Sequence, residues 1–114
     1  MEVKGDDYKV WYDPSEFTIY CQGALRLAGS EEYEPIVQIL EYVIDKAPQN
    51  INLDLVQLEF LNSSGINVLS KFVIKVRHKE KIKITVKGSE IVPWQGKSLK
   101  NLQRLMPNLK LNWS

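Results

Sequence analysis

Apolar and polar side chains alternate along five short stretches of the chain, which is the pattern of β-strands that bury one face. The predicted strands cover residues 8–12, 17–27, 51–60, 81–87 and 109–113. Gly23 interrupts the second stretch, and a glycine inside a strand is typical of a bulge or of a close approach by another backbone. Asp13-Pro14 follows the first stretch and Gly88 the fourth, so both strands are expected to end in turns.

Three further stretches repeat their apolar residues at intervals of three and four, which predicts amphipathic helices. The first helix is expected over residues 33–46, the second over residues 64–77, and the third between Pro93 and Pro107. Pro35 is compatible with the first helix only within its first turn, because a proline further along removes a backbone hydrogen bond. The side chains expected to face the core are Tyr33, Ile36, Val37, Leu40, Val43, Ile44, Ala47, Val68, Leu69, Phe72, Val73, Val76, Leu99, Leu102, Leu105 and Met106.

The predicted elements follow one another in the order β-β-α-β-α-β-α-β. Strands that alternate with helices form right-handed crossovers between parallel neighbours, so a mixed or largely parallel sheet is expected after the initial hairpin. A chain of 114 residues has the size of one domain. The predicted fold is therefore a single α/β domain over residues 1–114, with a four- to five-stranded mixed sheet and helices packed mainly on one face.

The composition is that of an ordinary folded protein, with 44% hydrophobic and 25% charged residues, and this argues against an intrinsically disordered chain. Cys21 is the single cysteine, so an intramolecular disulfide and a zinc site built on cysteines are excluded. No apolar run approaches the roughly 20 residues of a membrane span, and the N-terminus lacks the basic and apolar segments of a signal peptide. We therefore expect a cytoplasmic protein without a membrane partner.

Charge is divided unevenly between the two halves of the sequence. Residues 1–57 carry 4 basic and 11 acidic side chains, a net charge of −7, whereas residues 58–114 carry 11 basic and 3 acidic ones, a net charge of +8. Such a split can mark a nucleic-acid surface or a docking site for an acidic partner. Spaced lysines on one strand and one helix are also typical of faces in contact with water. We adopt this second interpretation, without a nucleic-acid partner, for Lys71, Lys75, Lys79, Lys81, Lys83 and Lys87.

The most informative segment is the turn between the third predicted strand and the second predicted helix, Leu61-Asn62-Ser63-Ser64-Gly65. It places two hydroxyl groups and several free backbone N–H groups at a helix N-terminus, where added negative charge is well tolerated. Phosphorylation of a serine there would add about −1.5 to −2 charges. The helix end can accommodate this charge, so a protein that docks over the turn would feel the change most.

The same segment resembles the signature of STAS domains, in which a strand, a Phe-x-Asp-Ser-Ser-Gly turn and a helix follow one another. Phe60, Ser63, Ser64 and Gly65 match that pattern in place, and Gly23-Ala24-Leu25 lies where the family often has a Gly-Glu-Leu-like strand exit. The order of elements agrees over residues 8–113. Within this family, the chain resembles the bacterial anti-sigma factor antagonists, which regulate transcription or stress signalling.

This resemblance implies a phosphorylation-switched partner-binding module. In the antagonists, the first serine of the turn is phosphorylated by a partner anti-sigma factor, which is a serine kinase of the histidine-kinase ATPase fold, and a metal-dependent phosphatase removes the phosphate. Only the unphosphorylated form binds the partner. By position, the resemblance assigns phosphorylation to Ser63, with Ser64 as second choice. It assigns partner binding to Asn62, Ser63, Ser64, Gly65, Gly23 and Leu25.

Two features depart from the family pattern. Asn62 stands where the family usually has aspartate, so a kinase contact through that carboxylate would be lost, although asparagine caps a helix about as well. Many members also end in one more helix, whereas this sequence stops after Trp113, which favours a partner or self-association over the uncovered surface. Three alternatives stay open: serines that only cap the helix, a STAS scaffold that no longer switches in a sensory complex, and a domain that binds a nucleotide or lipid.

Catalytic patterns are missing from the sequence. His78 has no second ligand or nucleophile spaced to it, and no Gly-x-Ser-x-Gly elbow, Walker-type phosphate loop or His-Glu-x-x-His motif occurs. The three tryptophans are more typical of packing than of a platform for stacked bases. We therefore expect neither an enzyme nor a bound metal or cofactor.

Overall fold

The computed structural model describes all 114 residues and contains seven strands and three helices. Their order along the chain is β1 (Glu2–Lys4), β2 (Tyr8–Asp13), β3 (Thr18–Leu25), α1 (Gly29–Asp45), β4 (Asn50–Asp54), β5 (Leu58–Leu61), α2 (Ser63–His78), β6 (Lys83–Gly88), α3 (Gln95–Leu105) and β7 (Lys110–Trp113).

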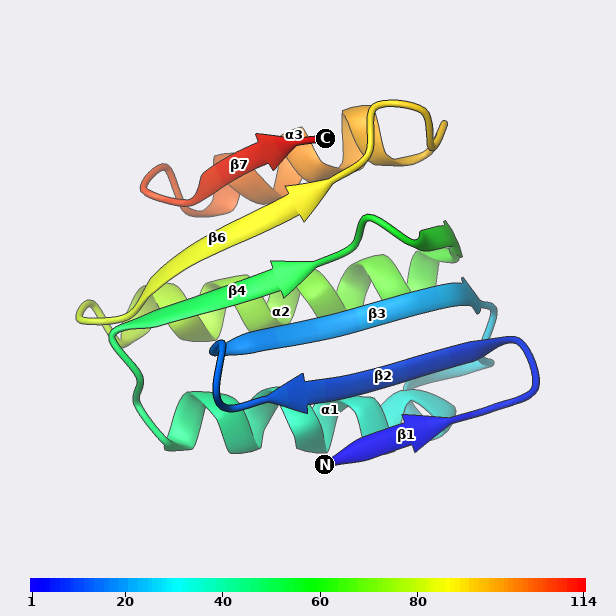
Figure 1. The fold of residues 1–114 in the computed structure, drawn as a ribbon, viewed down its shortest axis with the longest axis horizontal. Helices are drawn as coiled ribbons and strands as arrows, with labels where there is room; N and C mark the ends of the chain where they lie inside the picture. The colour runs from blue at the N-terminus through cyan, green and yellow to red at the C-terminus, as the bar shows by residue number, and fades with distance from the viewer.

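All strands join one mixed sheet in the order β1-β2-β3-β4-β6-β7, and β5 pairs with β3 beyond the end of β4. The pairs β1–β2 and β2–β3 are antiparallel, and the remaining pairs are parallel. The three helices cover one face of the sheet and leave the other face open (Figure 1). The predicted α/β fold is confirmed, but the sheet has seven strands and not the four to five that we expected.

The first additional strand is β1, which was too short to be recognised from its pattern; it places Val3 opposite Val10. The second arises because the stretch over residues 51–60 is broken into β4 and β5. The Asp54 carboxylate accepts a hydrogen bond from the Val56 N–H (3.1 Å), and the Leu58 N–H donates to the Leu55 carbonyl (3.0 Å). This turn moves β5 away from β6, so β5 has a strand partner on one edge only.

Helix α1 begins at Gly29 and therefore earlier than the sequence predicts. Pro35 consequently lies in the second turn of the helix and not in the first. The carbonyl that loses its N–H donor is that of Glu31, four residues earlier, and Glu31 is exposed to water. The prediction of Ala47 as a core residue was wrong, because the helix ends at Asp45 and Ala47 is exposed with φ of 48°.

One contiguous apolar core lies between the sheet and the helix layer. Most of the side chains predicted to face it are buried, and Ile39, which the predicted stripe omitted, joins them. Val37, Val68 and Leu105 were also predicted to face the core but are only half-buried. No helix of the structure combines the length and the apolar character of a membrane span.

Candidate functional site

The turn between β5 and α2 is organised by Asn62. This residue has extended backbone angles (φ −80°, ψ 176°) and caps α2, because its Oδ1 accepts a hydrogen bond from the Gly65 N–H at 3.0 Å. Its own backbone N–H donates to the Leu25 carbonyl at 3.1 Å, which continues the pairing of β5 with β3. The predicted capping role of Asn62 is confirmed.

The Asn62 side chain also ties the turn to α1 and to the end of β3. Its Oδ1 accepts a hydrogen bond from the Tyr33 hydroxyl at 2.7 Å, and its Nδ2 donates to the Leu27 carbonyl at 2.8 Å. Burial raises the pKa of the Tyr33 hydroxyl, which keeps it protonated as a donor. An aspartate could accept the first bond, but its carboxylate has no proton for the Leu27 carbonyl. The asparagine that departs from the STAS pattern therefore has a local structural reason.

Neither serine of the turn caps the helix. Ser63 is the first helical residue, and its side chain is exposed, whereas Ser64 is half-buried. The hydroxyls of both residues lack a hydrogen-bond partner within the protein, since the cap is supplied by Asn62. The alternative in which these serines serve only as caps is thereby removed. Of the two hydroxyls, that of Ser63 is the more accessible.

Two residues predicted to bind a partner are buried. Leu25 retains 3% of its exposure and packs in the core, and Gly65 is buried beneath the turn. A Cβ atom at Gly65 would lie 2.2 Å from a methyl carbon of Leu61 and 2.7 Å from the Tyr33 hydroxyl oxygen, so a larger residue would have to displace both side chains. Both residues therefore lie beneath the surface of the turn: the Leu25 side chain packs in the core, and Gly65 leaves room for Leu61 and Tyr33.

Gly23 lies in β3 at the predicted bulge, where the pairing with β5 shifts register. Its φ is +86°, and a Cβ atom there would lie 2.0 Å from the Asp7 carbonyl oxygen, so both backbone conformation and space require glycine. Its register partner is Leu58, whereas Leu25 pairs with Leu61 beside the turn. The structure thus brings Leu25, Asn62 and Gly65 together and leaves Gly23 outside this group, two positions earlier in β3.

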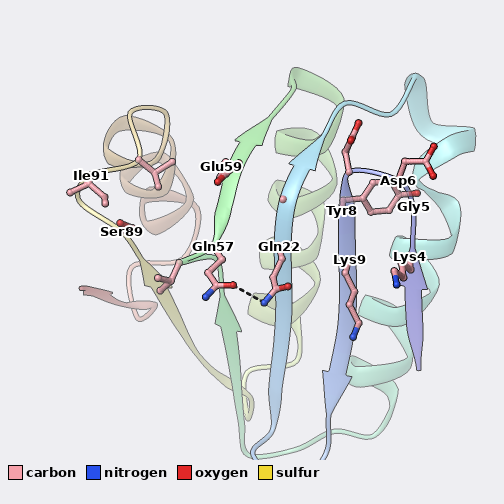
Figure 2. Close-up of a pocket in the computed structure, with 14 residues that line it drawn as sticks. Lys4, Gly5, Asp6, Tyr8, Lys9, Gln22, Gln57, Glu59, Ser89 and Ile91 are labelled. Carbon is pink, nitrogen blue, oxygen red and sulfur yellow. Dashed lines mark hydrogen bonds between the residues drawn. The ribbon is translucent and has the colours of Figure 1, made fainter.

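Gly23 instead borders a groove of about 600 Å³ on the uncovered face of the sheet, drawn in Figure 2. The groove extends from the β1–β2 turn across β3 and β5 to the loop of residues 89–92. A hydrogen bond of 2.7 Å between the side-chain amides of Gln22 and Gln57 crosses its floor. Its lining is mainly polar and contains acidic and basic side chains, among them Asp6, Glu59 and Lys4.

The reactive side chains of the chain are not gathered into a chemical site. Cys21 is 3% exposed, and burial raises the pKa of its thiol to about 12, so the nucleophilic thiolate is suppressed. His78 lies exposed at the end of α2. The histidine, cysteine, aspartate and glutamate residues form no group of three that could hold a metal ion.

The uneven charge of the sequence is distributed over two neighbouring helices. Helix α1 carries five acidic residues, and α2 carries basic residues from Lys71 onward. The lysines predicted to face water are exposed. Only one ion pair joins the two helices, between Lys75 and Glu41, and the only other pair in the chain joins Lys9 and Glu2.

Two residues that hold the turn are not indicated by the sequence motif around it, Tyr33 and Leu27. The position of Tyr33 in the apolar stripe predicts burial in the core but not the hydrogen bond from its hydroxyl to Asn62. A buried tyrosine hydroxyl needs a hydrogen-bond partner, and this was the available signal. The contribution of Leu27 is its backbone carbonyl, for which the sequence offers no signal.

No family model and no curated protein matches the chain. Two solved structures share its fold. One is the crystal structure of the diguanylate cyclase SiaD in complex with its activator SiaC from Pseudomonas aeruginosa, with a TM-score of 0.74, 11% identity, and coverage of 100% of this chain and 99% of the matched chain. The other is SiaC of Pseudomonas aeruginosa, with a TM-score of 0.68, 12% identity, and coverage of 100% and 94%. At identities of 11% and 12%, the likeness establishes a shared fold, and the coverage shows that this fold spans the whole chain.

Proposed function

We propose that this protein is a partner-binding regulatory module, whose docking surface surrounds the turn of residues 62–65 and whose binding is switched off by phosphorylation of Ser63. The observation that carries the proposal is the free, exposed Ser63 hydroxyl at the start of a helix that is already capped by Asn62. A phosphate there would meet the positive end of the α2 dipole and would not break any hydrogen bond of the fold.

The comparisons support the regulatory part of this proposal. SiaC, which has the same fold, is described as an activator in complex with a diguanylate cyclase. A small α/β domain of this kind can therefore act by binding an enzyme. For the present chain, the partner class follows from the STAS resemblance: a serine kinase of the histidine-kinase ATPase fold that acts as an anti-sigma factor, opposed by a metal-dependent phosphatase.

A partner can contact only the residues around the turn that are exposed to solvent. Ser63 and the exposed side of α2 belong to it, as does Arg26, whose guanidinium lies 4.9 Å from the centre of the exposed Phe60 ring. Leu25 and Gly65 lie beneath this surface. Phosphorylation would add charge at its centre, and a docked partner would have to desolvate that charge at considerable cost.

The test is phosphorylation in vitro with ATP, Mg²⁺ and each serine kinase of this fold from the same genome. We expect intact mass to increase by one phosphoryl group, peptide mapping to locate it on Ser63, and Ser63→Ala to abolish the reaction. Ser64→Ala serves as the matched control and should leave the reaction intact. Labelling of Ser64 alone, or none by a kinase that phosphorylates its own cognate substrate, would refute the switch.

A further inference from the structure

A second groove lies on the helix side of the molecule, between α1 and α2. Its floor is apolar and consists of Val37, Leu40, Ile44, Val68 and Phe72. The volume is about 160 Å³. Pockets for small molecules usually measure about 300–1,000 Å³, so this groove is too small for a cofactor-sized ligand. It has room for one or two large apolar side chains.

The two rims of this groove carry opposite charges. Glu34 and Glu41 line the α1 rim, and Lys71 and Lys75 line the α2 rim. Lys75 and Glu41 form an ion pair that bridges the groove. Glu34 and Lys71 belong to neither of the two ion pairs in the chain, so both are available to an outside partner.

The groove begins beside the proposed switch. Helices α1 and α2 run in the same direction, and both start at the end of the sheet where β3 and β5 finish (Figure 1). Ser30, in the first turn of α1, lies in the groove wall, and Tyr33, one turn further on, donates its hydroxyl to Asn62. Ser63 is the first residue of α2, five positions before Val68, so a charge placed on it lies at the same end of the two helices as the start of the groove.

The shape and charge of this groove determine what fits it. The residues that line the groove run from Ser30 to Ile44 on α1 and from Val68 to Lys75 on α2, so the groove follows roughly 10–20 Å of the helix axes. A third helix that lies along two others inserts its apolar side chains between them, as in known helix-in-groove recognition. The acidic α1 rim attracts basic side chains on the flank of that helix that faces it, and the basic α2 rim attracts acidic side chains on the opposite flank.

We propose that the groove between α1 and α2 receives one amphipathic helix of a partner protein. This helix places an apolar side chain between Val37 and Val68, basic side chains along the flank that faces α1, and acidic side chains along the flank that faces α2. The partner is the one of the proposed function, and in that respect the inference rests on it. Reversing a helix in a groove exchanges its flanks, so the charged rims also select the direction in which the helix lies.

The inference can be tested with synthetic peptides of about 18 residues, or five helical turns. Both peptides have the same leucine stripe and the same number of lysines and glutamates. In the first, lysine occupies one flank and glutamate the other; in the second, the charges are mixed on both flanks. Binding is followed through backbone amide shifts of the full-length protein, and a paramagnetic label on the peptide N-terminus reports its direction.

We expect the first peptide to bind about 3- to 10-fold more tightly than the second and to shift the amides of residues 34–44 and 68–75. Glu34→Lys and Lys71→Glu should each weaken binding about fivefold, since each replaces one attraction with a repulsion. The double exchange should restore affinity with the label at the opposite end of the groove. Lys97→Glu on α3 is the matched control and should have no effect. All three positions are exposed, so the variants are expected to fold.

Equal affinity of the two peptides would overturn the inference, and so would amide shifts confined to the uncovered face of the sheet around Gln57. Peptide-induced dimerisation of the protein, or a double exchange that does not restore peptide affinity, would overturn it as well. A further titration of Ser63→Asp separates this inference from the switch. If the wild type and Ser63→Asp bind the first peptide equally well, the groove still binds a helix, but a negative charge at residue 63 does not switch that binding off. If the wild type does not bind the first peptide, the groove proposal is refuted. The proposed phosphorylation of Ser63 is unaffected by that result, because the kinase test does not use the peptide.

Discussion

Gln95 closes the opening that the break between β4 and β5 leaves in the sheet, and its replacement by methionine is the most informative test of the fold. The side chain is fully buried at the start of α3. Its Oε1 accepts the Ser89 N–H at 2.7 Å, and its Nε2 donates to the carbonyls of Leu55 at 2.7 Å and Leu58 at 3.1 Å. Methionine has nearly the same shape and forms none of these bonds.

The loss of stability depends on which hydrogen bonds the three backbone partners of Gln95 keep after the replacement. The Leu55 carbonyl keeps the Leu58 N–H, and the Leu58 carbonyl keeps the Trp94 indole N–H at 3.0 Å. The Ser89 N–H has no other partner, and Ser89 is only 6% exposed. A net hydrogen bond contributes about 0.5–1.5 kcal/mol and an orphaned buried donor costs about 1–3 kcal/mol. We therefore expect Gln95→Met to lower the free energy of unfolding by about 2–4 kcal/mol.

Urea denaturation and a thermal melt measure this loss. For a chain of this length, 1 kcal/mol corresponds to about 4 °C in Tm, so a fall of about 8–16 °C is expected. Gln103→Met in the same helix is the matched control. Gln103 is half-buried and makes one hydrogen bond, from Nε2 to the Leu109 carbonyl at 3.1 Å. Its loss should cost about 1 kcal/mol or less.

A second variant, Gln95→Glu, separates hydrogen bonding from packing. Burial and the two facing carbonyls disfavour a carboxylate, so its pKa in the folded state should exceed the ordinary value of about 4.3. Stability is then largest below the unfolded pKa and is lost as the pH rises through the folded pKa. Relative to the wild type, the variant should recover near pH 4, whereas Gln95→Met should not. A Gln95→Met loss equal to that of the control, or a Gln95→Glu defect independent of pH, would refute the reasoning.

Three further outcomes follow from the turn and the bulge. Tyr33→Phe removes the hydroxyl bonded to Asn62 and should cost about 1 kcal/mol in urea denaturation, with a shifted Asn62 side-chain amide signal; an unchanged signal would contradict the contact. Gly23→Ala should cost at least about 2 kcal/mol because of the positive φ and the Asp7 carbonyl, whereas Gly96→Ala, with open space around it, should be neutral or stabilising by up to about 1 kcal/mol. Ser63→Asp should leave Tm unchanged or slightly raised, since a charge at an exposed helix start gains about 0.3–1 kcal/mol; a large fall would mean that the side chain is buried.

The local sequence pattern was sufficient to predict whether nearly every element is a helix or a strand. It also predicted part of the candidate site. Periods of two and of three to four identified the long strands and all three helices, because burial of one face imposes those periods on the sequence. Asn62 was recognised as a cap and Gly23 as a bulge, since both roles depend on the residue's own conformation. The start of α1 was misplaced, because the turn before Tyr33 adds no further apolar residue to the stripe.

The sequence by itself therefore determined the class of fold, the order of its main elements and the serine-bearing turn at the start of α2. Tertiary structure alone decided which residue closes the break in the long third strand and what holds the turn. Gln95 reaches a carbonyl 40 positions earlier in the chain, and Tyr33 reaches an amide 29 positions later. The charged groove between α1 and α2 likewise exists only when two separate helices lie side by side. Contacts of this kind depend on distances in space, which periodicity along the chain does not encode.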